Sequence, residues 1–138
     1  MSLSVVISTK KIDKEFISIL EKSSGVYKIE ILPYENNGEH SLTEIYNMGL
    51  KDSTNEIVLF CHDDIKFDTK NWGRKLLNHF KKSDYGIIGV AGCRYLPTSA
   101  KWWELPPEMM GQVYHENEGK RWLSTYNKKF GSDILPAV

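Results

Sequence analysis

The stretch EIVLFCHDDIKF, residues 56–67, decides the fold. Its apolar run ends abruptly in His62, Asp63 and Asp64. An unbroken apolar run of this length predicts a strand covered on both faces, as in a parallel sheet. The three polar side chains then lie at the carboxyl end of the strand, where open α/β sheets bind their ligands. The end of this strand is therefore either a polar turn or a functional site.

Strand and helix patterns alternate around this stretch. Strands are predicted over residues 3–8, 27–34, 56–61 and 85–92. The first predicted helix begins after Asp13 as N-cap and stops at Gly25, and the second covers residues 41–51. A third helix begins at Asp68 or Thr69 as N-cap, and its apolar stripe consists of Trp72, Leu76, Leu77 and Phe80. Ser41 and Glu44 have the spacing of a capping box. The order β-α-β-α-β-α-β predicts an α/β fold with a mostly parallel, Rossmann-like sheet and helices on both faces.

The last third of the chain has a different character. Residues 96–110, LPTSAKWWELPPEMM, are irregular and rich in Pro and Trp. A β-hairpin is predicted further on, in which residues 112–114 pair with residues 121–124 across a polar turn. SDILPAV, residues 132–138, predicts the start of another strand. A domain rarely ends on a fresh apolar strand, so we expect a truncated piece of a longer protein.

Composition limits the class of protein. The 138 residues are 41% hydrophobic, which fits one soluble globular domain. Lys and Arg together number 18, as do Asp and Glu, and this balance argues against a nucleic-acid binder but permits a small anionic ligand. Cys61 and Cys93 lie in apolar surroundings and predict buried thiols. With no signal peptide or membrane span in the sequence, we expect a cytoplasmic protein.

The polar strand end suits a metal ion. If the extended conformation continues past residue 61, His62 and Asp64 point the same way and Asp63 points the opposite way. Carboxylates are ligands for Mg²⁺ and Mn²⁺, and Mn²⁺ also accepts imidazole, while phosphate oxygens of a substrate complete the coordination. The competing interpretation is an Asp-Asp pair that only caps a turn, which the residues alone favour.

Three other features have structural interpretations beside functional ones. Lys10 and Lys11 follow the first strand and are placed to meet a phosphate, although a solvated pair is the favoured interpretation. Trp102 and Trp103 suit a sugar platform, but packing is favoured. Glycines at positions 86, 89 and 92 lack the spacing and position of a dinucleotide fingerprint, so close backbone packing is expected there.

The segment SLTEIYNMGLKDSTNEIVLFCHDDIKF, residues 41–67, resembles the central part of family 2 glycosyltransferases with the GT-A fold. More closely, the chain resembles a bacterial glycosyltransferase-like subgroup with a YN-x-G helix before EIVLFCHDD, and GIIGVAGCRYL before a Trp pair fits the same subgroup. The resemblance implies a GT-A-like fold and inversion at the anomeric carbon. It also implies a UDP- or GDP-sugar donor, a carbohydrate or other hydroxyl acceptor, and Mn²⁺ or Mg²⁺.

The resemblance also assigns roles to residues. His62-Asp63-Asp64 occupies the place of the D-x-D motif, with Asp64 and His62 as metal ligands. The implied donor-binding residues are Ser8, Thr9, Glu35, Asn36, Asn37, Tyr46, Asn47, Gly49 and Asp63. The sequence departs from the family at His62, where an acid is usual, and at Asn36 and Asn37, where the family often has an acid that reads the base. The catalytic base is expected beyond Val138, with Glu104, Glu108 and Glu116 as default candidates.

These observations give one domain over residues 1–138. Residues 4–94 form its nucleotide-binding core, and residues 95–138 begin the acceptor side. We expect the chain to be the donor-binding part of a metal-assisted, inverting hexosyltransferase. The longer protein is expected to be cytoplasmic or peripheral to the inner membrane. A non-catalytic nucleotide- or sugar-binding module is the alternative. A phospho-acceptor signalling domain is disfavoured, because its acid pair follows the first strand, which here ends in Ser8 and Thr9.

Overall fold

The computed structural model describes residues 1–82 and 84–126 and divides the chain into two units, Met1–Asp84 and Tyr85–Val138. Each unit has its own sheet. The strand predicted over residues 132–138 lies outside the described residues. None of the described helices has the length and apolar character that crossing a membrane requires.

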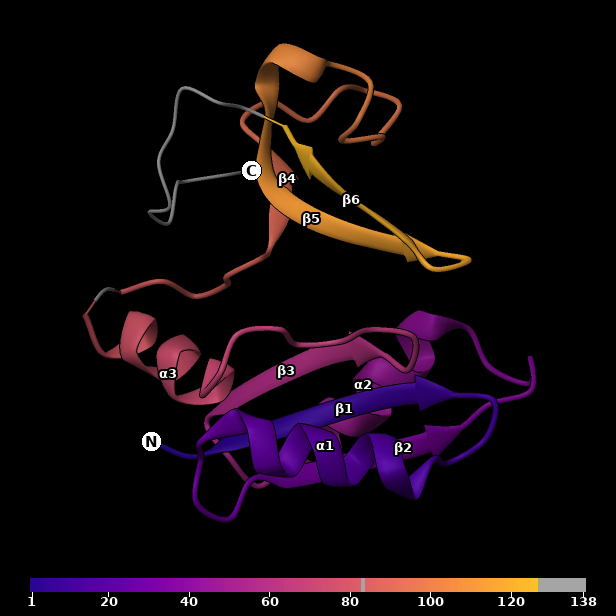
Figure 1. Ribbon diagram of the computed structural model, residues 1–138, viewed down its shortest axis with the longest axis vertical. Helices are drawn as coiled ribbons and strands as arrows, with labels where there is room; N and C mark the ends of the chain where they lie inside the picture. Colours follow the sequence, from indigo (N-terminus) through magenta and orange to yellow (C-terminus); the bar gives the residue numbers. More distant parts are fainter. Residues whose placement is uncertain (83, 127–138) are drawn as a thin grey trace. The chain divides into compact units, whose positions relative to one another are not determined.

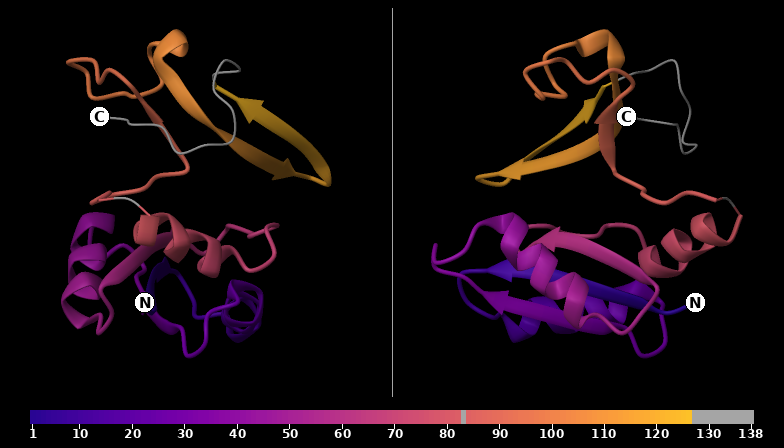
Figure 2. Two further views of the ribbon diagram at one scale, coloured as in Figure 1. Left: turned by 90° about the vertical axis from the view of Figure 1, so that its left-hand side faces the viewer. Right: turned by 180° about the vertical axis from the view of Figure 1, so that it is seen from behind.

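The first unit is a parallel sheet with helices on both faces (Figure 1). Its elements are β1 (Leu3–Thr9), α1 (Lys14–Ser24), β2 (Glu30–Glu35), α2 (Leu42–Asp52), β3 (Ile57–His62) and α3 (Trp72–Lys82). The strand order is β2-β1-β3, so β1 is central and both of its neighbours run parallel to it. Helix α1 covers the face seen in Figure 1, and α2 covers the opposite face, seen from behind in the right panel of Figure 2. The predicted α/β class is confirmed.

Local sequence signals set the helix ends as predicted. The Asp13 carboxylate accepts hydrogen bonds from two amides of the first turn of α1, and Gly25 ends that helix with a φ of +67°. The Ser41 hydroxyl accepts the Glu44 amide proton, while the Glu44 carboxylate accepts the Ser41 amide proton. The hydrogen bonds from Ser41, the backbone one first, also lower the pKa of Glu44.

Alternation along β1 divides its side chains between two packed faces. One face joins Leu3, Val5 and Ile7 to a buried cluster completed by Leu20, Cys61, Trp72 and Leu77. Cys61 and Cys93 are buried free thiols, as predicted, and burial, with a smaller effect of the Asp63 charge, raises the pKa of Cys61 to about 12. Val6 faces the other way, against Gly49 of α2.

Helix α3 begins later than predicted. Asp68 and Thr69 are not its N-cap, because Asn71 adopts a left-handed conformation with a φ of +57° just before the helix. The Asn71 amide donates to the carbonyl of Ser23 over 2.9 Å, and the Asn71 carbonyl accepts the first helical bond from Lys75. The start of the helix is thus fixed by a contact with the end of α1. The predicted apolar stripe is confirmed, with Trp72 and Leu77 buried.

The predicted fourth parallel strand over residues 85–92 is wrong. Only Ala91–Cys93 forms a strand, β4, which pairs antiparallel with β5 in the second unit. The parallel sheet therefore has three strands among the described residues. Gly86 and Gly89 offer no side chains to pack, and Ile87 is 92% exposed. An apolar run alone predicts a strand but does not show which other strand it pairs with.

The second unit is an antiparallel sheet with the order β4-β5-β6. A short 3₁₀ helix, η1 (Pro106–Glu108), precedes β5 (Met109–Asn117), and β5 pairs with β6 (Lys120–Thr125) in the predicted hairpin (Figure 1). Glu118 and Gly119 both have positive φ angles, as a two-residue type I′ turn requires. Trp102 packs edge-on against Trp103 and Tyr126. Packing therefore explains Trp102, whereas Trp103 is 56% exposed.

Candidate functional site

The parallel register brings the carboxyl ends of three strands to one edge. Ser8 lies beside Tyr34 of β2 and His62 of β3, and Thr9 lies beside Glu35. The amide of Asn36 extends this pairing by donating to the Thr9 carbonyl over 2.8 Å. Side chains from segments distant in sequence therefore meet at the edge where open α/β sheets bind ligands.

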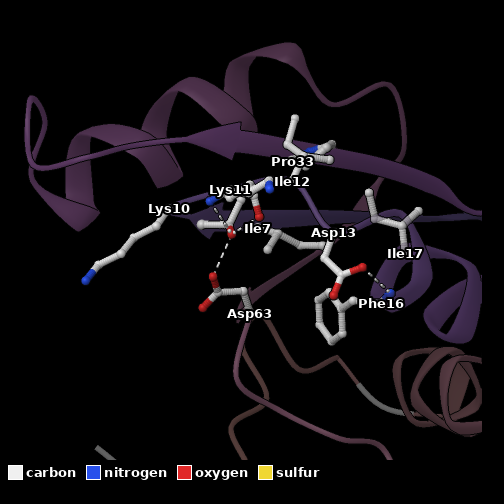
Figure 3. A pocket seen from close by; sticks show the side chains of 10 residues that line it. Ile7, Lys10, Lys11, Ile12, Asp13, Phe16, Ile17, Pro33 and Asp63 are labelled. Atoms are coloured by element: carbon white, nitrogen blue, oxygen red, sulfur yellow. Dashed lines mark hydrogen bonds between the residues drawn. The ribbon is translucent and has the colours of Figure 1, made fainter.

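A pocket of about 250 Å³ opens at this edge (Figure 3). It is lined by the end of β1, the loop that follows, the first turns of α1, one residue of β2 and one residue after β3: Ile7, Thr9, Lys10, Lys11, Ile12, Asp13, Phe16, Ile17, Pro33 and Asp63. Its walls combine apolar side chains with two ammonium groups and two carboxylates. Since ligand pockets usually measure about 300–1,000 Å³, this volume suits part of a nucleotide sugar.

Thr9 and Asp63 link the two strand ends that form the pocket. The Thr9 hydroxyl lies 2.6 Å from the Asp63 carboxylate and 2.8 Å from the Lys11 carbonyl, and it accepts the Lys11 amide proton. A hydroxyl has one proton to donate, and the charged, closer carboxylate is the better acceptor. Figure 3 shows the Asp63 carboxylate turned toward the end of β1. Asp63 is thus held in place at the mouth of the pocket.

The three polar residues after the apolar run have different surroundings. Strand β3 ends at His62, and Asp63 and Asp64 form a turn, so the extended conformation assumed in pairing His62 with Asp64 does not continue. All three are exposed, but Asp63 alone lines the pocket. Within residues 1–82 and 84–126, no group of three or more His, Cys, Asp or Glu side chains is arranged to hold a metal ion.

The residues after β2 organise a loop. Glu35 accepts the Ile12 amide proton over 2.9 Å and so fixes the segment that carries Lys10 and Lys11. The side chain of Asn36 bonds to the backbone of Gly38 and to both backbone groups of His40. The hydrogen bonds of the Asn36 side chain therefore stabilise its own loop. Asn37 is exposed, and its amide donates to Glu39.

The predicted residues of α2 lie on the other side of the sheet from the pocket. Tyr46 is half-buried, its ring lies 4.9 Å from that of Phe60, and burial raises its pKa. Asn47 is exposed. A side chain at Gly49 would overlap Val6 of β1, so this glycine allows the helix to approach the sheet closely. Gly49 therefore has a packing role in the structure.

Lys10 and Lys11, for which the sequence favours a solvated pair over a phosphate contact, are both exposed. Both line the pocket, and Lys10 extends outward from it in Figure 3. Neither ammonium group has a hydrogen bond or ion pair with another described residue. Their position directly after the central strand was the available signal. The sequence gives only structural roles to three other lining residues. It predicts Asp13 as a helix cap, Phe16 as an apolar helix position and Pro33 as the end of a strand.

The default candidates for the base all lie in the second unit. The Glu104 carboxylate accepts the Ser99 hydroxyl proton over 2.5 Å and lies 3.5 Å from the Lys101 ammonium group. Glu108 is half-buried at the end of η1, and Glu116 is exposed on β5. Nothing in these surroundings singles out one of them as a base.

The comparisons with known proteins identify one matching family. The sequence model of a family described as "Glycosyltransferase like family" matches residues 4–134. The match covers both units and most of the chain. No curated protein and no solved structure matches the chain.

Proposed function

The chain belongs to the glycosyltransferase-like family, and on this premise we propose that its first unit binds the diphosphate part of a nucleotide-sugar donor. The observation that carries the proposal is the pocket at the end of β1, which holds Lys10, Lys11 and Asp63 together. Ammonium groups attract phosphate oxygens, and a carboxylate fixed nearby suits a cation that neutralises the same phosphates. The donor is a UDP- or GDP-sugar.

The donor set at the strand end fits a divalent ion completed by ligand oxygens. Asp63, Asp64 and His62 supply carboxylates and an imidazole, which Mn²⁺ accepts. Because these residues do not form a closed cluster, the phosphates of the donor would supply the remaining oxygens. When bound, the ion would stabilise negative charge on the departing diphosphate. Asp64 and His62 are the ligands we propose, and Asp63 is held by Thr9 beside them.

The proposed reaction is transfer with inversion. An acceptor hydroxyl attacks the anomeric carbon, the bond from that carbon to the diphosphate oxygen breaks, and the hydroxyl proton passes to a base. Lys10 and Lys11 would hold the diphosphate as its charge increases. The acceptor is a carbohydrate or another hydroxyl compound. The first unit thus supplies donor binding and leaving-group stabilisation.

Isothermal titration calorimetry tests this proposal. The 138-residue chain is titrated with UDP and with GDP, each with and without Mn²⁺. We expect saturable binding of one of the two nucleotides that Mn²⁺ strengthens, and loss of the Mn²⁺ effect in Asp64→Ala. Glu21→Ala, an exposed carboxylate on α1, is the matched control. Absence of binding by both nucleotides under all conditions, with the chain folded by circular dichroism, would refute the proposal.

A further inference from the structure

A second pocket, of about 350 Å³, lies far from the proposed donor site. It is formed by the connection between α1 and β2 and by one side of α3, and the residues that matter are Val26, Tyr27, Arg74, Leu77, Asn78 and Lys81. Met1 lines it as well, whereas Thr9 lines the donor pocket, so the two pockets lie at opposite ends of β1. The 7 residues of β1 span roughly 20 Å.

The charge of this pocket is one-sided. Its polar side chains are a guanidinium, an ammonium, an amide and a phenol, and none of the described residues that line it carries a carboxylate. The whole chain, in contrast, has 18 basic and 18 acidic residues. Among the described residues, no hydrogen bond or ion pair engages the side chain of Arg74 or Lys81. Two cations that share a pocket and lack a partner are complementary to an anion.

Helix α3 places these groups on one side. Arg74, Asn78 and Lys81 follow one another at i, i+4 and i+7, which brings them to the same face, above the buried Leu77. The helix sequence WGRKLLNHFKK contains no acid. Arg74 lies in the first turn, where the helix dipole favours acids and disfavours cations. Arg74 and Lys81 thus give this exposed face of α3 two positive charges and no negative one.

The framework around the pocket is fixed by close contacts. The indole Nε1 of Trp72 donates to the Ser23 hydroxyl over 3.0 Å, and Asn71 donates to the Ser23 carbonyl. A side chain at Gly73 would collide with Val26, so the start of α3 lies directly on the connection after α1. The backbone that holds Arg74 and Asn78 is therefore anchored before a ligand arrives, which reduces the ordering cost of binding.

We propose that this pocket binds a phosphate group. The guanidinium of Arg74 offers paired donors that match phosphate, Lys81 adds a second positive charge, and the Asn78 amide adds a neutral donor. A polyanion such as a nucleic acid is disfavoured by the zero net charge of the chain. The phosphate belongs either to a free small molecule or to a lipid headgroup. The proposal is independent of donor binding, because the two pockets share no residue.

NMR titration of the ¹⁵N-labelled chain tests the proposal, with inorganic phosphate as one probe and phosphatidylglycerol vesicles as the other. The test pair is Arg74→Gln with Lys81→Gln. The matched control is Lys75→Gln with Lys82→Gln, which removes the same charge from the same helix at the same spacing but outside the pocket. Circular dichroism checks that both double variants fold. Phosphatidylcholine vesicles serve as the uncharged control surface.

Saturable shifts of the Asn78 side-chain signals with inorganic phosphate, with an affinity weakened about tenfold or more in the test pair and retained in the control pair, would support a small-molecule phosphate. The same dependence with phosphatidylglycerol vesicles alone would support a headgroup. Equal weakening in both pairs, or no response to either probe, would overturn the proposal. Signals of Thr9 and Asp63 report the donor pocket separately, so a failure of one proposal is distinguishable from a failure of the other.

Discussion

The Thr9 hydroxyl and the Asp63 carboxylate lie 2.6 Å apart and join the end of β1 to the turn after β3. Thr9 is 7% exposed, so its side chain has one arrangement, whereas the turn that carries Asp63 is on the surface. A short hydrogen bond to a charged acceptor is stronger than a neutral one. The contact therefore fixes the first acid after β3 against the central strand, at the mouth of the proposed donor pocket.

Replacing Thr9 with Val keeps the shape of the side chain and removes the hydroxyl. We expect the free energy of unfolding to fall by about 1–3 kcal/mol, because the hydrogen bond to the Asp63 carboxylate and the one from the Lys11 amide are both lost. Nucleotide affinity, measured by calorimetry, is expected to fall as well, because Asp63 is no longer fixed. Thr43→Val on the exposed side of α2 is the control and should leave affinity unchanged. Equal affinities of Thr9→Val and the parent chain would show that the contact does not serve binding.

The pair Lys10 and Lys11 predicts a charge effect on donor binding. Replacing both with Gln removes two cations from the pocket, and we expect nucleotide affinity to fall by about tenfold or more. The salt dependence of binding should become shallower, because fewer charges take part. Replacing the exposed Lys22 and Lys51 with Gln makes the same change of net charge elsewhere. If both double variants lose affinity equally, the effect belongs to net charge and the pocket assignment is wrong.

The position of Gly49 predicts that replacing this helix glycine with alanine lowers the stability of the chain instead of raising it. Alanine at an ordinary helix position stabilises relative to glycine by about 1 kcal/mol. At position 49 the added methyl group overlaps Val6, so we expect Gly49→Ala to destabilise the chain by about 1–3 kcal/mol in thermal or urea unfolding. Val6→Ala in the same chain should recover part of the loss. Gly86→Ala, where a new Cβ meets no atom within 4 Å, is the control.

Glu30 predicts a loss of stability in acid. The Ser4 hydroxyl, followed by the amide and hydroxyl of Thr54, donates to its carboxylate and holds the pKa of Glu30 below its usual 4.5. A lowered folded-state pKa gives stability that is complete above the unfolded-state value and is lost as the pH falls through the folded-state value. We therefore expect the loss to begin near pH 4.5 and to grow below it.

Urea unfolding at several pH values between 7 and 3 measures this loss. Glu30→Gln should have a smaller decrease in stability over the acidic part of this range than the parent chain. Glu44→Gln should remove another part of the decrease, because the pKa of Glu44 is lowered by its bonds to Ser41. An acidic decrease in Glu30→Gln that equals the decrease of the parent chain would contradict the role assigned to the Ser4 and Thr54 bonds.

Sequence reasoning succeeded where the deciding contacts are local. The bonds between Ser41 and Glu44 span three positions, and the Asp13 cap and the Gly25 stop depend on adjacent backbone. The hairpin of β5 and β6 depends on a turn within its own sequence. The parallel order also followed from alternation of strands and helices, and the carboxyl-end edge that it predicts is where the first pocket lies.

The rest depends on contacts between distant positions. Thr9 lies 54 positions before Asp63, so their hydrogen bond has no signature in either local sequence. The expected pairing of His62 with Asp64 assumed an extended backbone, and the chain turns after His62 instead. The apolar run over residues 85–92 was consistent with a strand, but the partner strand was not encoded locally. The close approach of Gly49 to Val6 of β1 likewise joins distant positions and has no signature in the local sequence.

Paramagnetic broadening by Mn²⁺ tests the central claim most directly. The ¹⁵N-labelled chain is titrated with Mn²⁺ in the presence of UDP or GDP, whichever binds in calorimetry, and the loss of each amide signal is measured. We predict that broadening is strongest at His62, Asp63 and Asp64, extends to Thr9, Lys10 and Lys11, and is weak at Arg74 at the other end of the first unit. Broadening centred elsewhere, or the same broadening in Asp64→Ala as in the parent chain, would contradict a metal-assisted donor site at the end of β3.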